Sequence, residues 1–130
     1  MHRSTNIYAS VIEDLIVWIE HNLSDDLSIK TVASRAGYSH WHLQRIFKEY
    51  MDVSLATYIR HRRLEMAKME IIENRYKILD IAIKYGYGSQ QEFTRVFKRI
   101  TGHSPARYRR ITLKERFQLI TKSHTQSAGR

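Results

Sequence analysis

Two groups of residues recur along the chain with the same spacing, and their side chains suit contacts with DNA. The first group is Trp41, Gln44, Arg45 and Lys48, and the second is Gln91, Thr94, Arg95 and Lys98. Positions i, i+3, i+4 and i+7 share one face of a helix. Arg presents a planar fork to guanine and Gln a donor and an acceptor to adenine, while a Thr methyl or an indole edge packs on thymine methyl and Lys suits phosphate. Each stripe therefore predicts a base-reading helix face.

The elements that must position these stripes also occur twice. Apolar residues at helical spacing predict a short helix and then a second helix, with a glycine turn between them. In the first unit the two apolar faces are Ile29, Val32, Ala33 and Ala36, then Leu43, Ile46, Phe47 and Tyr50, around Gly37-Tyr38-Ser39. In the second they are Ile78, Ile81, Ala82 and Tyr85, then Phe93, Val96, Phe97 and Ile100, around Gly86-Tyr87-Gly88. The offset is 49 residues from Gly37 to Gly86 and 50 from Ser39 to Ser89, which places one extra residue in the second turn. A short helix, a turn and a second helix form the helix-turn-helix arrangement, whose second helix enters the major groove.

The remaining pattern predicts an all-α protein of about seven helices, in which two helix-turn-helix subdomains are joined by a long central helix. Ile12, Leu15, Ile16 and Ile19 form the apolar face of a first helix. Leu55, Ile59, Met66 and Met69 form one face of the connecting helix, and Leu64, Ala67 and Ile71 form another. The predicted segments are 1–53, the first subdomain with its N-terminal helix; 54–73, the connecting helix; 74–114, the second subdomain; and 115–130, a polar and flexible tail in which the apolar pattern fades.

Composition favours a polyanionic partner. Among 130 residues, Lys+Arg 22 against Asp+Glu 13 gives a net charge of +9, which attracts nucleic acid or an anionic membrane. The longest uncharged apolar run, Leu15 to Ile19, is far shorter than the roughly 20 residues a membrane span needs. The absence of Cys excludes disulfides and Cys-ligated zinc. We therefore expect a protein of the cytosol with no membrane partner.

The stretches Gly37 to Lys48 and Gly86 to Lys98 resemble the two motifs of AraC-family transcription activators, in the short two-motif branch that includes MarA, SoxS and Rob. The resemblance implies a monomer that places two recognition helices in successive major grooves of an asymmetric double-stranded DNA site and recruits RNA polymerase, in the bacterial cytosol and without a cofactor. By resemblance, the base-reading residues are Trp41, Gln44 and Arg45 in the first helix and Gln91, Glu92 and Arg95 in the second. Thr94 joins them from its place in the stripe, and Lys48, Lys98, Ser39 and Ser89 are assigned to the DNA backbone.

For several of these residues the sequence allows more than one role. Glu92 departs from the family pattern; it could accept from cytosine N4 or hold Arg95 three residues on. Trp41 could be a core aromatic. Arg60, Arg62 and Arg63 could contact phosphate or pair with the acidic first helix.

Two other classes of function are compatible with parts of the sequence. A metalloenzyme could use the seven His, but no HExxH motif or carboxylate cluster with ligand spacing is present, so we expect neither an enzyme nor a metal site. A non-specific architectural nucleic-acid-binding protein is the stronger alternative, because charge alone gives affinity for any polyanion. Since only about ten residues precede the first helix, we also expect activity to follow abundance and not a bound effector.

Overall fold

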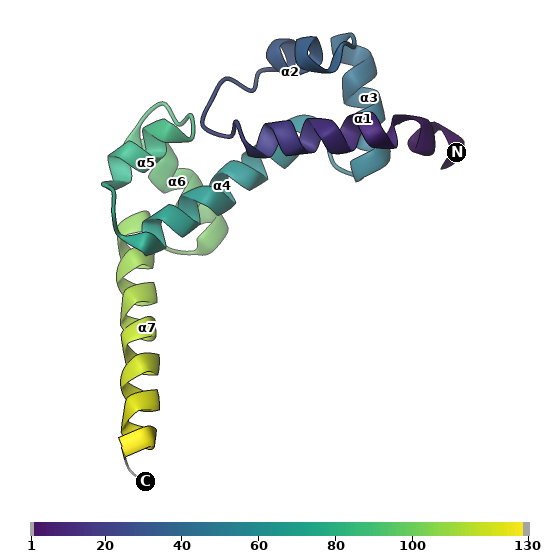
Figure 1. Ribbon diagram of the computed structural model, residues 1–130. Helices are drawn as coiled ribbons and strands as arrows, with labels where there is room; N and C mark the ends of the chain where they lie inside the picture. The colour runs from purple at the N-terminus through teal and green to yellow at the C-terminus, as the bar shows by residue number, and fades with distance from the viewer. Residues whose placement is uncertain (1, 129–130) are drawn as a thin grey trace. The chain divides into compact units, whose positions relative to one another are not determined.

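The computed structural model describes residues 2–128, with side chains for 7–123, and this part of the chain folds into seven α-helices without a strand (Figure 1). The helices are α1 (His2–Glu20), α2 (Ile29–Ala36), α3 (His40–Met51), α4 (Leu55–Glu73), α5 (Ile78–Lys84), α6 (Gln90–Thr101) and α7 (Pro105–Ala128). The prediction of an all-α protein with about seven helices is confirmed. None of the helices, over the described residues, combines the length and apolar character that crossing a bilayer requires.

The chain divides into two compact units, Met1–Glu65 (unit 1) and Met66–Arg130 (unit 2). The division falls inside α4, so each unit takes one half of this helix. The half of α4 in unit 1 buries Leu55, Ile59 and Leu64, and the half in unit 2 buries Ala67 and Ile71, so this helix contributes to two cores.

Unit 1 builds its core from one apolar face of each of its helices. The core residues are Ile12, Leu15 and Ile19 of α1, Val32 and Ala33 of α2, Leu43, Ile46 and Phe47 of α3, and Leu55, Ile59 and Leu64 of α4. At the start of α2, Ser28 accepts a hydrogen bond from the backbone N–H of Thr31, and the helix ends at Gly37 with φ +77°. An L residue with a side chain adopts this conformation at a cost, so Gly37 fixes the exit of α2.

Unit 2 repeats this plan with more aromatic side chains. Its core contains Ala67 and Ile71 of α4, Ile81, Ala82 and Tyr85 at α5, Phe93 and Phe97 of α6, and the first residue of α7, Pro105. The Phe93 and Phe97 rings lie 5.5 Å apart, and Tyr108 meets Phe97 edge-on at 5.2 Å. Tyr58 meets Phe47 in the same way at 5.6 Å in unit 1, where Leu43 stands in place of Phe93.

The two turns differ as their spacing predicts. One residue, Tyr38, separates Gly37 from the N-cap Ser39, whereas Tyr87 and Gly88 separate Gly86, with φ +85°, from the N-cap Ser89. The extra residue of the second turn is therefore confirmed.

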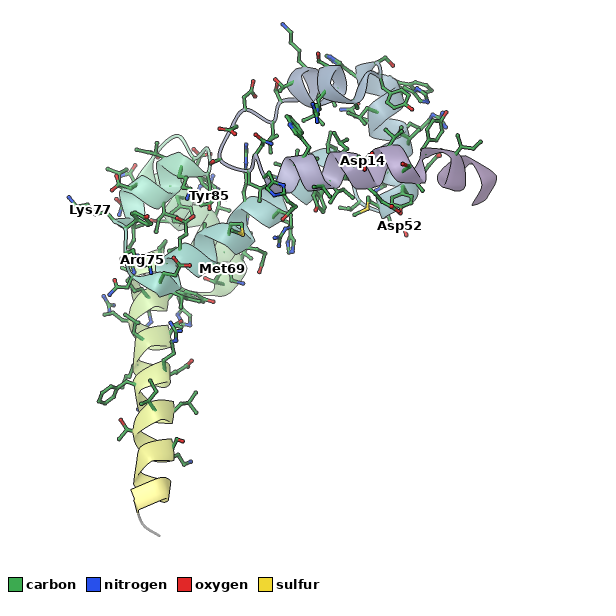
Figure 2. The ribbon with its side chains drawn as sticks, in the orientation of Figure 1. Asp14, Asp52, Met69, Arg75, Lys77 and Tyr85 are labelled. Carbon is green, nitrogen blue, oxygen red and sulfur yellow. The ribbon has the colours of Figure 1, made fainter. Side chains whose placement is uncertain are left out.

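Two residues expected on apolar core faces are exposed in the structure. Met69, labelled in Figure 2, is 54% exposed because it lies two residues from both Ala67 and Ile71, and thus on the opposite side of the helix from these buried residues. Ile100, in the last turn of α6, is 57% exposed.

The segment predicted as a polar, flexible tail, 115–130, is helical as far as Ala128, and residues 129–130 lie outside the described part of the chain. The loss of an apolar face in the sequence indicates that this segment is not buried, and it does not indicate that the helix ends. Residues 112–128 contain no Gly or Pro and keep helix-favouring residues. Phe117, Leu119 and Ile120 are exposed on this part of α7.

Candidate nucleic-acid interface

Helices α3 and α6 begin in the same way. Ser39 Oγ accepts a hydrogen bond from the His42 N–H at 3.2 Å, and Ser89 Oγ accepts one from the Glu92 N–H at 3.1 Å. Ser and Thr oxygens at this position satisfy an N–H group that the helix itself leaves without a partner. Both hydroxyls, which were assigned to the DNA backbone, are therefore also N-caps, and each keeps an O–H group that can donate to a phosphate.

The predicted stripe of α3 lies on the surface of unit 1. Trp41 is 70% exposed, and Gln44, Arg45 and Lys48 are exposed as well. The opposite face of the helix holds the buried residues Leu43, Ile46 and Phe47. This exposure excludes the alternative in which Trp41 is a core aromatic.

Two neighbours on α3 fix the Arg45 side chain. Its guanidinium carbon lies 5.3 Å from the centre of the Trp41 ring, and its Nη1 donates to Glu49 Oε1 at 3.0 Å. Trp41 and Glu49 are four residues before and four residues after Arg45, so all three share one face of the helix. Stacking of Arg on an indole and an ion pair both favour one orientation of the guanidinium.

The stripe of α6 is also exposed at Gln91, Arg95 and Lys98, while Thr94 is half-buried. Gln90, Gln91, Thr94 and Arg95 line one open hollow on this helix. The structure therefore brings Gln91, Thr94 and Arg95 together on one surface of unit 2. Phe93 and Phe97 occupy the buried face behind them.

Glu92 has a structural role that neither sequence alternative included. Its Oε2 accepts a hydrogen bond from the Gly88 backbone N–H at 3.0 Å, while its own N–H donates to Ser89 Oγ. This reciprocal arrangement is close to a capping box, which Ser-x-x-Glu before an apolar run predicts. The sequence Ser89-Gln90-Gln91-Glu92 carried that signal. The extra residue of the second turn, Gly88, supplies the N–H that Glu92 binds.

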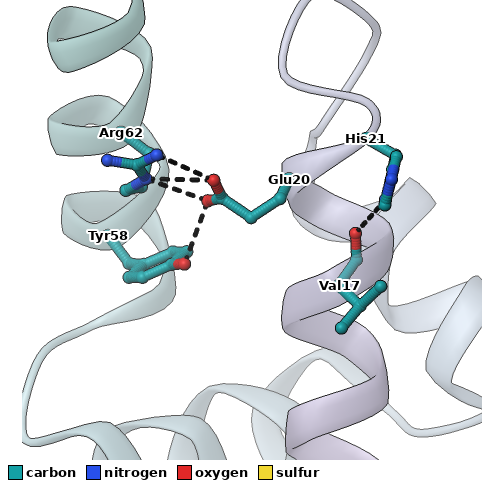
Figure 3. Close-up of polar contacts among 5 residues, drawn as sticks. All are labelled: Val17, Glu20, His21, Tyr58 and Arg62. Atoms are coloured by element: carbon teal, nitrogen blue, oxygen red, sulfur yellow. Dashed lines mark hydrogen bonds and ion pairs between the residues drawn. The ribbon is translucent and has the colours of Figure 1, made fainter.

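The structure separates the roles of Arg60, Arg62 and Arg63. Arg62 donates from Nε and Nη2 to the Glu20 carboxylate of α1, with distances from 2.9 to 3.1 Å (Figure 3). Arg63 donates to the carbonyl oxygens of Leu23 and Asp25, and Arg60 donates to Thr57 Oγ1 at 3.1 Å. Arg62 therefore pairs with the acidic first helix, and Arg63 holds the segment that follows this helix.

Tyr58 completes the Glu20 cluster, donating its hydroxyl hydrogen to Oε2 at 3.0 Å (Figure 3). The hydrogen bonds from Arg62 hold the pKa of the Glu20 carboxyl below its usual range, although burial opposes this shift. Burial and the hydrogen bond to Glu20 raise the pKa of Tyr58 to about 12. Glu20 and Arg62 are 42 residues apart, so no local spacing in the sequence predicts this contact.

Unit 2 contains a corresponding polar cluster around a buried carboxylate. Glu70 of α4 is 7% exposed and accepts hydrogen bonds from Lys84 Nζ at 3.0 Å and from the Tyr85 hydroxyl. Tyr85, labelled in Figure 2, is the residue at which α5 ends. Arg109 of α7 donates to the carbonyl oxygens of Ile71 and Tyr76, as Arg63 does to Leu23 and Asp25 in unit 1. These contacts attach α5 and α7 to α4 and so position the second helix-turn-helix.

Among the described residues, no group of three or more His, Asp and Glu is placed to hold a metal ion. The polar surfaces of α3 and α6 thus combine amide, hydroxyl, indole and cationic groups on rigid helices. This is the chemistry of base-edge and phosphate contacts.

Comparison with known proteins assigns the family. A family model described as a helix-turn-helix domain matches residues 21–111. The transposon Tn10 TetD protein of Escherichia coli is 48% identical over 108 residues, which are 83% of this chain and 78% of that protein. The chain belongs to the AraC-type helix-turn-helix family.

Other relatives of this AraC-type chain are named as transcriptional activators or regulators. The transcriptional activator AarP of Providencia stuartii is 41% identical over 107 residues, covering 82% of this chain and 79% of that protein. The transcriptional regulator Rob of Salmonella typhimurium is 46% identical over 102 residues. The match covers 78% of this chain but 35% of Rob, so the chain spans about a third of that longer relative. The predicted branch of the family is confirmed.

A solved structure supports the same fold. The DNA-binding domain of AdpA, a global transcriptional factor crystallised in complex with a target DNA, aligns with a TM-score of 0.75 and 23% identity. The alignment covers 82% of this chain and 96% of that domain. The AraC-type family consists of DNA-binding transcription regulators, so this chain is a DNA-binding regulator and not an enzyme.

Proposed function

We propose that the chain is a sequence-specific transcription activator that binds an asymmetric duplex site as a monomer, with α3 and α6 in successive major grooves. The observation that carries the proposal is the pair of exposed stripes on two N-capped helices, each preceded by a left-handed glycine turn. Similar faces on one chain remove the need for a symmetric dimer. The bacterial cytosol is the proposed location.

Within this proposal, side-chain chemistry divides the contacts. Trp41, Gln44 and Arg45 of α3 read one set of bases, and Gln91, Thr94 and Arg95 of α6 read another. Lys48, Lys98 and the N-cap hydroxyls of Ser39 and Ser89 bind the backbone. Glu92 shapes the start of α6 by accepting from the Gly88 N–H at Oε2, and its carboxylate keeps acceptor capacity for cytosine N4.

The two stripes carry different residues at corresponding positions, and this difference determines whether the DNA site is symmetric. Trp41 corresponds to Gln91, and Gln44 corresponds to Thr94, whereas Arg and Lys recur. The two halves of the site therefore differ in sequence, and the site has a direction. Activation is part of the proposal and is supported by relatives named as activators, such as AarP. Contact with RNA polymerase is the proposed means of this activation.

Selection of bound sequences from a random duplex pool, followed by footprinting, tests the proposal. We expect a directional motif with two recognised segments about one helical turn apart and protection over both. A symmetric motif would contradict monomeric binding. Equal affinity for all duplexes would instead favour a non-specific architectural protein, for which the net charge of +9 is sufficient.

A further inference from the structure

Arg45 and Arg95 occupy corresponding positions in the two stripes, but only Arg45 is fixed by neighbours within the described residues. The Arg45 guanidinium lies over the Trp41 ring and donates to Glu49, whereas no ion pair or ring contact of Arg95 is present in this part of the chain. At the corresponding positions, four residues to either side, Arg95 has Gln91 and Arg99. Gln91 has no aromatic ring on which Arg95 could stack, and the positive charge of Arg99 repels that of Arg95.

The ion pair leaves Arg45 able to read a base. Glu49 accepts from Nη1, and a guanidinium has five N–H groups, so other N–H groups remain to face guanine O6 and N7. The indole and the carboxylate restrict rotation of the long side chain before DNA arrives. A side chain that is already ordered loses less entropy when it binds.

Fold stability gives little reason for Glu49 to lie beside the stripe of α3. Both side chains of the pair are about two-fifths exposed, at 42% for Arg45 and 41% for Glu49, and an exposed ion pair on a helix contributes little to folding. An exposed carboxylate beside a DNA-binding face also repels phosphate, which lowers affinity for any duplex. The contact of Glu49 with Arg45 instead points to the way in which Arg45 selects its base pair.

We propose that Glu49 is a positioning residue that orients the Arg45 guanidinium toward one base pair. Its charge lowers the affinity for any duplex, while its contact with Arg45 raises discrimination at that base pair. The inference rests on the proposed function, since it requires that Arg45 reads a base. It also assigns different properties to the two stripes: within the described residues, neighbours fix Arg45 of α3, and no ion pair or ring contact fixes Arg95 of α6.

Glu49→Gln tests the inference, with Glu115→Gln as a matched control. Glu115 is an exposed acid of α7, which carries neither stripe, so its variant removes the same charge from a different helix. Dissociation constants are measured for a selected duplex, for duplexes changed at each single base pair, and for a random duplex. Discrimination is the ratio of affinities for the selected and the singly changed duplex.

For Glu49→Gln, we expect discrimination at one base pair to fall about threefold to tenfold, because the orienting ion pair is lost. Affinity for the random duplex should rise about twofold to threefold, because a negative charge is removed. Glu115→Gln should leave discrimination unchanged. The base pair affected must be the one at which Arg45→Ala relaxes preference, and Glu49→Gln should change discrimination no further in the Arg45→Ala background.

The reciprocal change is Arg99→Glu, which gives Arg95 an acid at i+4. We expect discrimination at the base pair read by Arg95 to rise and affinity for random DNA to fall. Unfolding transitions of Glu49→Gln and Arg99→Glu, compared with the original chain, check that both variants fold.

Two results would overturn the inference alone. In the first, Glu49→Gln raises affinity for all duplexes by one factor, which indicates only charge repulsion. In the second, it weakens specific and random binding together, which indicates a structural role. If the unchanged chain shows no discrimination between duplexes, the proposed function fails as well.

Discussion

The two helix-turn-helix units have the same arrangement of helices. They differ in the length of the turn and in the side-chain contacts that fix the start of the second helix. In unit 1, Tyr38 alone separates Gly37 from Ser39, and its ring meets His42 edge-on at 4.9 Å. In unit 2 the turn has one more residue, and Glu92, the counterpart of His42, binds the Gly88 N–H at 3.0 Å. An aromatic contact in one unit and a capping carboxylate in the other thus stabilise the same junction.

Arg45 and Arg95, the arginines proposed to read bases, also differ between the two units. Arg45 contacts Trp41 and Glu49, whereas Arg95 lines an open hollow with Gln91 and Thr94. A repeated backbone plan therefore does not require repeated side-chain contacts. The cores follow the plan closely, while the residues at the turn and on the exposed stripe have diverged.

Removing a buried ring from either core should lower the free energy of unfolding more than any of the other substitutions, and it tests whether each unit depends on its own core. Phe47→Ala and Phe97→Ala each remove a fully buried ring, and each should lower the free energy of unfolding by about 3–5 kcal/mol. Both Trp residues, Trp18 and Trp41, belong to unit 1. In urea unfolding, Phe47→Ala should shift the Trp fluorescence transition, while Phe97→Ala should shift mainly the loss of helical circular dichroism. Equal shifts of both signals in both variants would contradict separate cores.

The next prediction concerns the carboxylate cluster of unit 1. Glu20→Gln removes the charge that Arg62 and Tyr58 bind and should lower the free energy of unfolding by about 1–2 kcal/mol at pH 7. The folded pKa of Glu20 is lowered, so its contribution is present above the unfolded pKa and is lost as the pH falls through the folded pKa. The difference between the original chain and the variant should therefore shrink in acid.

Asp14→Asn is the matched control for Glu20→Gln, because Asp14 is an exposed acid on the same helix (Figure 2). We expect this variant to change the free energy of unfolding by less than about 0.5 kcal/mol. A Glu20→Gln effect that is equally small, or that is constant from pH 7 to pH 3, would argue against a stabilising ion pair in unit 1.

The smallest expected effect concerns the second turn. Glu92→Ala removes the acceptor of the Gly88 N–H and should lower the free energy of unfolding of unit 2 by about 0.5–1 kcal/mol. Gln91→Ala changes a neighbouring exposed residue of α6 and should have a smaller effect in the same thermal unfolding measurement. If Glu92→Ala stabilises the protein, the proposed capping role of Glu92 is wrong.

Local patterns predicted the helices, the turns and the stripes because each depends on residues a few positions apart. The i, i+3, i+4, i+7 spacing was sufficient to place Phe47 and Phe97 in the cores and Arg45 and Arg95 on the surface. The spacing from Ser89 to Glu92 held a further local signal, a capping box, that the prediction did not use.

The contacts that the sequence could not predict join distant segments. Arg62 binds Glu20 across 42 residues, and Arg109 binds the carbonyl oxygen of Ile71 across 38. No periodicity specifies which surface arginine folds back onto the protein, because that choice depends on where two helices meet. The same reasoning explains Glu70, an acid whose burial beside Lys84 follows from packing and not from its neighbours in sequence.

Base-resolved binding of Arg45→Ala and Arg95→Ala measures whether α3 and α6 read different parts of one DNA site. On the selected duplex each variant should lose about 1–3 kcal/mol of binding free energy and relax preference at its own base pair, the two pairs lying in separate segments. Lys48→Ala should instead weaken all duplexes alike. Equal losses on selected and random DNA for both Arg variants, with no base pair relaxed, would contradict the account.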